Sequence, residues 1–167
     1  FGETIEDPYR WLEDFTSDES REWVEKQNIL TDKFLSNPYQ KKLKKELEDI
    51  WISDQISIPY RKGDKTFYFF NDGKKQQSVF MVRGCDDCEA KVLLDPNNFS
   101  NDGTISLGDV SVSPDGKKIA YSISDGGSDW RTWKVMDIET KEHLIDKIEW
   151  SKFSYATWES DSSGFYY

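Results

Sequence analysis

Apolar side chains recur at helical spacing through the first 54 residues of the chain. A first stripe, with spacings of seven and four, consists of Trp23, Leu30 and Phe34. Asn37-Pro38 is typical of an N-cap followed by the first helical position, and it introduces a second stripe. That stripe consists of Leu43, Leu47, Ile50 and Trp51. Such repeats are typical of amphipathic helices, so residues 1–54 are predicted to be a helical segment.

The sequence also indicates where the first helices begin. Asp7 followed by Pro8 predicts a short N-capped helix over residues 7–14, with the proline in its first turn. Thr16 and Glu19 then form a T-x-x-E pattern, which is typical of a capping box. We therefore expect Thr16 to cap the longer helix that contains the first stripe.

After residue 55 the pattern changes to short runs of aromatic and β-branched residues. These runs, which favour strands, are residues 65–70, 78–82, 91–94, 118–123 and 132–136. Asp-Gly pairs lie between many of them, and such pairs accept the positive φ angles of tight turns. Residues 55–167 are therefore predicted to form antiparallel sheets.

One strand–turn–strand unit recurs about every 50 residues, a period typical of propeller blades. Its three copies end in similar aromatic segments: Gly63–Tyr68, Gly116–Tyr121 and Ser163–Tyr167. The pattern predicts a mostly β chain that contains the first two blades and part of a third, with a β-sandwich as the alternative. The third copy stops within a blade, and two blades would leave open strand edges. We therefore expect the chain to be the N-terminal piece of a longer polypeptide.

Composition narrows the classes of function. The chain has 167 residues, of which 22 are Lys or Arg and 32 are Asp or Glu, so its formal net charge is −10. This sign argues against a nucleic-acid partner and against docking on an anionic membrane. No apolar run approaches the ~20 residues that span a bilayer. The two cysteines, Cys85 and Cys88, form half of a zinc motif and are expected to be two surface thiols in a turn, with a disulfide as the alternative.

The sequence lacks a self-sufficient set of catalytic residues. The G-x-S-x-G pattern that exposes a nucleophilic serine is absent. The single histidine, His143, lies between charged residues and is interpreted as a surface side chain. H-E-x-x-H, EF-hand, P-loop and dinucleotide-binding patterns are also absent. We therefore expect neither a metal nor a cofactor, and no catalytic residue in this chain.

Several motifs resemble the start of the prolyl oligopeptidase family. Asp7-Pro8-Tyr9-Arg10-Trp11-Leu12-Glu13-Asp14 is similar to its opening, and Trp23–Asn28 continues the likeness. Further on, Ser113–Lys117 resembles its second blade and Gly127–Thr132 resembles its G-S-D-W segment. These motifs occur in the right order over essentially the whole chain. The related oligopeptidase B branch usually opens differently, so the proline-specific branch is favoured.

The resemblance implies a fold and an activity for the whole protein. Members are cytosolic or periplasmic serine peptidases in which a seven-bladed propeller caps an α/β-hydrolase domain. By this resemblance, residues 1–54 are the helical N-terminal segment of the hydrolase domain and residues 55–167 begin the propeller. The whole enzyme would hydrolyse short peptides after proline, with the propeller as a size filter. The catalytic triad would follow the propeller, in the remaining C-terminal part of the same peptidase.

One residue is assigned to the substrate site by the same resemblance. Family members place a propeller phenylalanine in the substrate pocket, shortly before a W-x-x-D-x-x-G turn, and Phe153 precedes Trp158 and Asp161 at matching spacing. Phe153 would form an apolar wall on the acyl side of a proline-containing peptide, or else it is a core aromatic of the blade. Asp129, Trp130 and Arg131 lie either near a domain interface or within the blade packing.

Two other functions remain open on the sequence alone. An oligopeptidase B-like enzyme that cleaves after basic residues would suit the acidic charge. A non-catalytic binding module derived from a propeller is the other alternative. The resemblance indicates a cytoplasmic protein, or a periplasmic one if a leader precedes Phe1.

Overall fold

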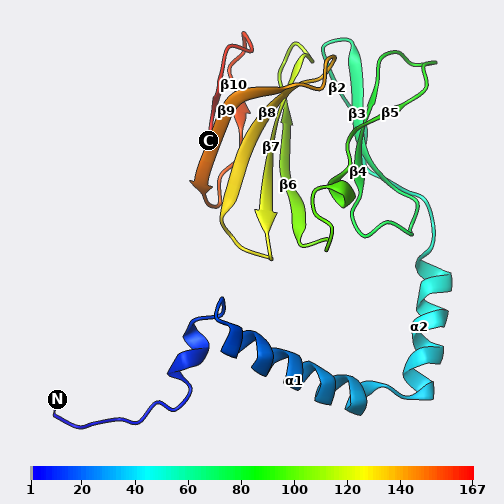
Figure 1. Cartoon of the computed structure of the whole chain (residues 1–167). Coiled ribbons are helices and arrows are strands. Elements are labelled where there is room, and N and C mark those ends of the chain that lie inside the picture. The colour runs from blue at the N-terminus through cyan, green and yellow to red at the C-terminus, as the bar shows by residue number, and fades with distance from the viewer. Residues whose placement is uncertain (1) are drawn as a thin grey trace. The chain divides into compact units, whose positions relative to one another are not determined.

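A computed structural model describes residues 2–167, which divide into a helical unit ending at Trp51 and a β unit from Ile52 to Tyr167 (Figure 1). The helical unit contains a short 3-10 helix, η1 (Arg10–Glu13), and two α-helices, α1 (Asp18–Leu35) and α2 (Pro38–Trp51). The β unit contains eleven strands and a second 3-10 helix. The two units are described separately below.

The helical unit forms its two α-helices as the apolar pattern predicts, but two of the predicted helix starts differ. The predicted cap at Asp7 is wrong, because η1 begins only at Arg10, after Tyr9, and has no side-chain cap; the Asp7 carboxylate instead accepts a hydrogen bond from Tyr9 N–H at 3.3 Å. Asn37 caps α2, since its side-chain oxygen accepts a hydrogen bond from the backbone N–H of Gln40 at 2.9 Å. The cap of α1 is Ser17, whose hydroxyl oxygen accepts from Ser20 N–H at 3.2 Å. The predicted capping box at Thr16 is therefore wrong, because the Thr16 hydroxyl instead donates to the Asp14 carboxylate at 2.7 Å.

Little of the helical unit is buried. Among residues 2–51 only Ser20 is buried, and its hydroxyl donates to the carbonyl of Trp11 at 3.2 Å. Trp11 also packs edge-to-face on Trp23, with ring centroids 6.4 Å apart. Much of both predicted stripes is exposed, including Leu30, Phe34, Leu47, Ile50 and Trp51. Amphipathic helices with uncovered apolar faces gain little stability from packing within this unit.

The β unit consists of two antiparallel sheets and one additional hairpin. The first sheet comprises β1 (Gln55–Ile56), β2 (Tyr60–Lys62), β3 (Lys65–Asn71), β4 (Val79–Arg83) and β5 (Lys91–Leu94), with β1 and β2 both paired to β3. The second comprises β6 (Ile105–Val112), β7 (Lys118–Asp125), β8 (Arg131–Asp137) and β9 (His143–Ser151) in sequence order. The hairpin pairs β10 (Thr157–Trp158) with β11 (Phe165–Tyr166), and η2 (Pro96–Asn98) connects the two sheets. This arrangement confirms the predicted mostly β fold.

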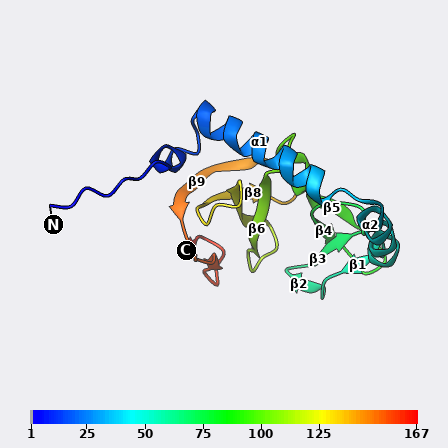
Figure 2. The ribbon, with the colours of Figure 1, turned by 90° about the horizontal axis from the view of Figure 1, so that it is seen from below.

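The sheets lie side by side and share a core (Figure 2). Phe67 and Phe80 of the first sheet belong to the same buried cluster as Val112, Ile119 and Met136 of the second. A second cluster, around Trp133, Ala120, Val135 and Ala156, joins the second sheet to the β10–β11 hairpin. Burial of several aromatic side chains, each with a large apolar area, supplies the main stabilisation of these blades.

Tight turns join neighbouring blades at one end of the sheets. Gly63 N–H donates to the carbonyl of Pro114 at 3.1 Å. Gly116 has φ +71°, and a Cβ placed on it would lie 2.5 Å from the carbonyl oxygen of Lys62. Both the positive φ and this close approach require glycine. In the third copy the corresponding contact is different, because Ser162 adopts φ +62° and its hydroxyl accepts from Asp115 N–H at 3.2 Å.

Aspartates close several turns of the β unit. The Asp115 carboxylate accepts hydrogen bonds from the Ser113 hydroxyl at 2.6 Å and from Lys117 N–H at 3.1 Å. These donors, the serine first, hold the pKa of Asp115 below its usual range because they favour the charged form. Backbone N–H donors lower the pKa of other turn aspartates in the same way: Asp72, Asp102 and Asp137.

Candidate functional site

The loop between β9 and β10 contains the residue predicted to contact substrate. Phe153 lies in this loop with φ +53° and a 76% exposed side chain. Trp150, near the end of β9, has φ +59° and is also 76% exposed. Neither belongs to the two core clusters. Since non-glycine residues rarely adopt positive φ, two exposed aromatic residues in this conformation mark a locally strained segment.

The Lys152 ammonium lies over two aromatic rings. Its Nζ is 5.0 Å from the ring centroid of Phe153 and 5.3 Å from that of Trp130. The same nitrogen is 3.2 Å from the Asp129 carboxylate. Cation–π attraction and this ion pair together orient the exposed side chains.

A second tryptophan extends this cluster. Trp150 packs edge-to-face on Trp130, with centroids 5.8 Å apart and an interplanar angle of 79°. We refer to Trp130, Trp150, Lys152 and Phe153 as the aromatic cluster. It connects the loop before β8 with the loop after β9.

One buried and one half-buried serine anchor the loop beside the cluster. Ser151 is buried, and its hydroxyl accepts a hydrogen bond from Trp133 Nε1 at 3.1 Å. The hydroxyls of Ser151 and Ser154 share a further hydrogen bond at 2.6 Å. Because Trp133 is in the blade core, the strained loop is attached to a rigid part of the fold.

Asp129, Trp130 and Arg131, the residues of the G-S-D-W segment and its neighbour, have different partners. Asp129 pairs with Lys152 and Trp130 packs on Trp150, so both belong to the surface around Phe153. Arg131 instead pairs with Asp109 of β6, inside its own blade. The sequence did not single out Trp150 or Lys152 for function, although the E-W-S-K-F segment offered a visible signal of two aromatics beside a lysine.

The predicted surface histidine does not form a catalytic pair with a serine or a carboxylate. His143 Nε2 lies 2.6 Å from the hydroxyl of Tyr121. The tyrosine is largely buried, and this burial raises its pKa. Across residues 2–167 no group of three or more histidine, cysteine, aspartate or glutamate side chains could bind a metal ion. In the same range, no helix is long and apolar enough to cross a membrane.

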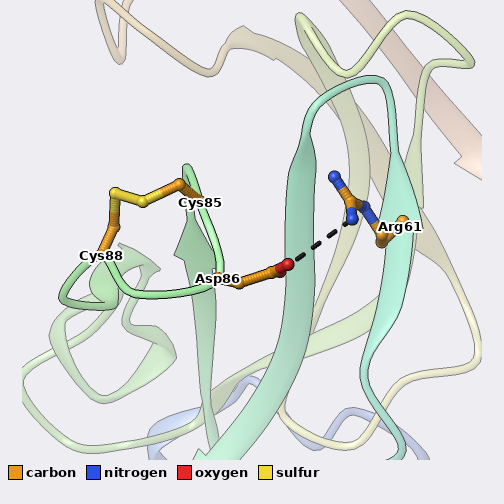
Figure 3. Close-up of a disulfide and its surroundings, with 4 residues drawn as sticks. All are labelled: Arg61, Cys85, Asp86 and Cys88. Atoms are coloured by element: carbon orange, nitrogen blue, oxygen red, sulfur yellow. Dashed lines mark ion pairs between the residues drawn. A yellow bond between two sulfur atoms is a disulfide. The ribbon is translucent and has the colours of Figure 1, made fainter.

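The two cysteines form a disulfide in the loop between β4 and β5 (Figure 3). The expectation of two surface thiols is therefore wrong, because the three-residue spacing lets the turn bring both sulfurs together. Beside them, the Asp86 carboxylate faces Arg61 of β2 at 3.9 Å. The antiparallel pairing of β3 with β4 places this loop near the β2–β3 turn.

These blades define the β unit as the start of a β-propeller, and comparison identifies the family. Residues 1–167 match the family described as "Prolyl oligopeptidase, N-terminal beta-propeller domain". The chain belongs to the prolyl oligopeptidase family.

Named relatives and solved structures agree with this assignment. The chain is 40% identical over 167 residues to the prolyl endopeptidase of Elizabethkingia miricola, covering 99% of this chain and 24% of that protein. Prolyl oligopeptidase A of Amanita bisporigera is 34% identical, with 98% of this chain and 24% of that protein covered.

A solved prolyl endopeptidase structure superposes with a TM-score of 0.83 at 35% identity and covers 98% of this chain and 24% of its own. Prolyl oligopeptidase B from Galerina marginata, bound to a 35mer substrate, gives a TM-score of 0.75 at 30% identity and covers 96% of this chain and 25% of its own. The chain thus spans about a quarter of the length of these proteins.

Proposed function

We propose that this chain is the N-terminal part of a serine peptidase that hydrolyses short peptides on the carboxyl side of proline. The observation that supports this most strongly is similarity over almost the whole chain to proteins named prolyl endopeptidase. The relatives' names favour neither cleavage after basic residues nor a non-catalytic module. The partners are proline-containing oligopeptides and the remaining C-terminal part of the same peptidase.

In this proposal residues 1–54 and residues 55–167 have different roles. Residues 1–54 belong to the peptidase domain, and their uncovered apolar stripes pack on the C-terminal part that contains the catalytic triad. Residues 55–167 begin the propeller, which excludes folded proteins from the active site. The exposed apolar side chains of α1 and α2 support the first assignment, because amphipathic helices require a partner surface.

Phe153 provides an apolar wall for the substrate. Its ring contacts the residues on the acyl side of the scissile bond, and it excludes water from that side of the pocket. A ring presented on an anchored loop loses little conformational freedom on binding, which favours affinity. The 76% exposure of its side chain supports a role in contact with another molecule.

The disulfide supports a periplasmic location over a cytoplasmic one. Disulfides persist in oxidising compartments, whereas cytosolic thiols are kept reduced. A protein purified from the periplasm should contain Cys85 and Cys88 in the oxidised form. Thiol-specific labelling of both cysteines without prior reduction would contradict this assignment.

The activity is tested with the full-length gene product and two reporter peptides. A peptide that ends in Gly-Pro before the reporter should be cleaved, and one that ends in Gly-Arg should not. Cleavage of the arginine peptide alone would overturn the proline specificity. Phe153→Ala should lower kcat/KM by about 10-fold or more, mainly through KM, because burial of an aromatic contact contributes about 1.5–3 kcal/mol. Ile145→Ala, which removes a 99% exposed apolar side chain from β9, is the matched control.

A further inference from the structure

The aromatic cluster presents more ring surface than a single pocket wall requires. Phe153 and Trp150 are both three-quarters exposed, while Trp130 is about half exposed. The Lys152 ammonium contacts Trp130 and Phe153 at similar distances, 5.3 and 5.0 Å. Trp150 packs on Trp130, and the Lys152 ammonium contacts both Trp130 and Phe153, so the three rings and the ammonium belong to one exposed cluster.

The conformation of the loop indicates a role in binding. Positive φ at Trp150 and Phe153 costs of order 1–3 kcal/mol for each residue. The hydrogen bonds of Ser151 to Trp133 and Ser154 maintain this conformation from inside the blade. The loop thus holds two rings outward at the expense of backbone strain, although turning them inward would bury apolar area.

We propose that Trp150 and Trp130 bind the residues of the peptide substrate that lie further from the scissile bond than the residue on Phe153. This inference rests on the proposed function, because it takes Phe153 as the wall nearest the reaction. The preferred occupants are apolar or proline side chains, which stack on indole faces and have no charge to desolvate. Lys152 is a positioning residue, since its ammonium joins the rings and is itself held by Asp129.

The molecule that binds to the aromatic cluster is a peptide substrate, and not the C-terminal part of the chain. The cluster is continuous with Phe153, so a peptide that reaches Phe153 in extended form can continue over the tryptophans. The ion pair between Lys152 and Asp129 compensates the charges at this surface, which suits a neutral segment.

The test compares substrate lengths in the full-length enzyme. Two reporters share the same residues next to the scissile bond, and one adds three upstream residues that include a phenylalanine and a proline. The measured quantity is the ratio of kcat/KM for the long peptide to that for the short one. Trp150→Ala should lower this ratio by roughly tenfold through the KM of the long peptide.

Control variants separate binding from a structural role. Trp150→Tyr keeps a ring and should retain the ratio within about threefold. Ile145→Ala on the same strand should leave the ratio unchanged. Lys152→Arg should preserve more of the ratio than Lys152→Met, since only the arginine keeps the charge over the rings.

Two outcomes would overturn the proposal. An unchanged ratio in Trp150→Ala means that the peptide does not reach Trp150. An equal loss for both peptides, with a lower melting temperature, means that the tryptophans pack on the rest of the chain. If the enzyme cleaves after a residue other than proline, the two reporters are rebuilt on that residue. The length ratio then tests the aromatic cluster even though the proposed specificity has failed.

Discussion

Trp51 of the helical unit and Trp133 of the β unit lie in opposite environments. Trp51 of α2 is 70% exposed, whereas Trp133 of β8 is 1% exposed and donates a hydrogen bond from its indole nitrogen. Both lie in amphipathic patterns that the sequence displays clearly. The difference shows that a hydrophobic pattern predicts the element and its apolar face, but not which surface covers that face.

The largest effect should come from the core of the second blade. Trp133→Ala should reduce the stability of β7 and β8 by about 3–5 kcal/mol, since it leaves a cavity in a packed cluster. Trp51→Ala in the 167-residue chain should change stability by less than about 0.5 kcal/mol, as expected for an exposed site. Hydrogen exchange followed by mass spectrometry measures both effects locally. Equal losses of stability in the two variants would show that Trp51 and Trp133 do not differ in their contribution to packing.

A smaller effect should arise where the two blades meet. Gly116→Ala combines a positive φ with a close contact to Lys62 and should cost roughly 2–4 kcal/mol. Gly127→Ala, at φ +74° with open space around it, should cost only about 1 kcal/mol. The difference between the free energies of unfolding of these two variants measures the contribution of the close contact between Gly116 and Lys62. Similar unfolding midpoints in urea would show that Gly116 can move away from Lys62.

A loss of about 1 kcal/mol is expected at the start of α1. Ser17→Ala removes the hydroxyl that accepts from Ser20 N–H, and N-cap deletions typically cost this amount. Ser17→Asp should retain the cap, while Thr16→Ala should have a smaller effect because Thr16 does not cap the helix. Hydrogen exchange of the first-turn amides distinguishes the three variants. A larger loss in Thr16→Ala than in Ser17→Ala would restore the capping box.

The smallest effect concerns acid stability of the turn between β6 and β7. The pKa of Asp115 is lowered in the folded chain, so the charged carboxylate stabilises the fold above its unfolded pKa. This contribution is lost as the pH falls through the lowered, folded pKa. Ser113→Ala removes the first donor and should raise the pKa of Asp115 toward the ordinary value of an aspartate. An NMR titration measures this pKa, and an unchanged value in the variant would assign the shift to Lys117.

The sequence predicted the regular elements well because their signals are local. Runs of aromatic and β-branched residues marked β3, β4, β5, β7 and β8, and Asn37-Pro38 marked the start of α2. The long strands β6 and β9 were not among the predicted runs, because their sequences contain more polar and charged residues. The cap of α1 was wrong because Thr16, Ser17 and Glu19 offer competing side chains within one turn. The disulfide was uncertain because spacing alone does not separate two thiols from a bridge.

The aromatic cluster was only partly predictable for a different reason. Phe153 was assigned through the family resemblance of its segment, and its pocket role stays a prediction. Trp150 was missed because strand propensity predicts an ordinary extended residue, while tertiary contacts of Ser151 and Ser154 hold Trp150 at positive φ. Local residue preferences cannot predict a backbone conformation that depends on a hydrogen bond to Trp133, 18 residues away in the sequence.

The contacts of Gly63 with Pro114 and of Gly116 with Lys62 limit which residues can change without altering the spacing between neighbouring blades. At this end of the sheets the spacing between the first two blades is determined by contacts between main-chain atoms, which glycine permits at Gly63 and Gly116. Substitutions of exposed side chains elsewhere on a blade should therefore leave the spacing between neighbouring blades unchanged. The loops at the opposite end of the sheets, which include the loop of Phe153, can therefore change their side chains without altering this spacing.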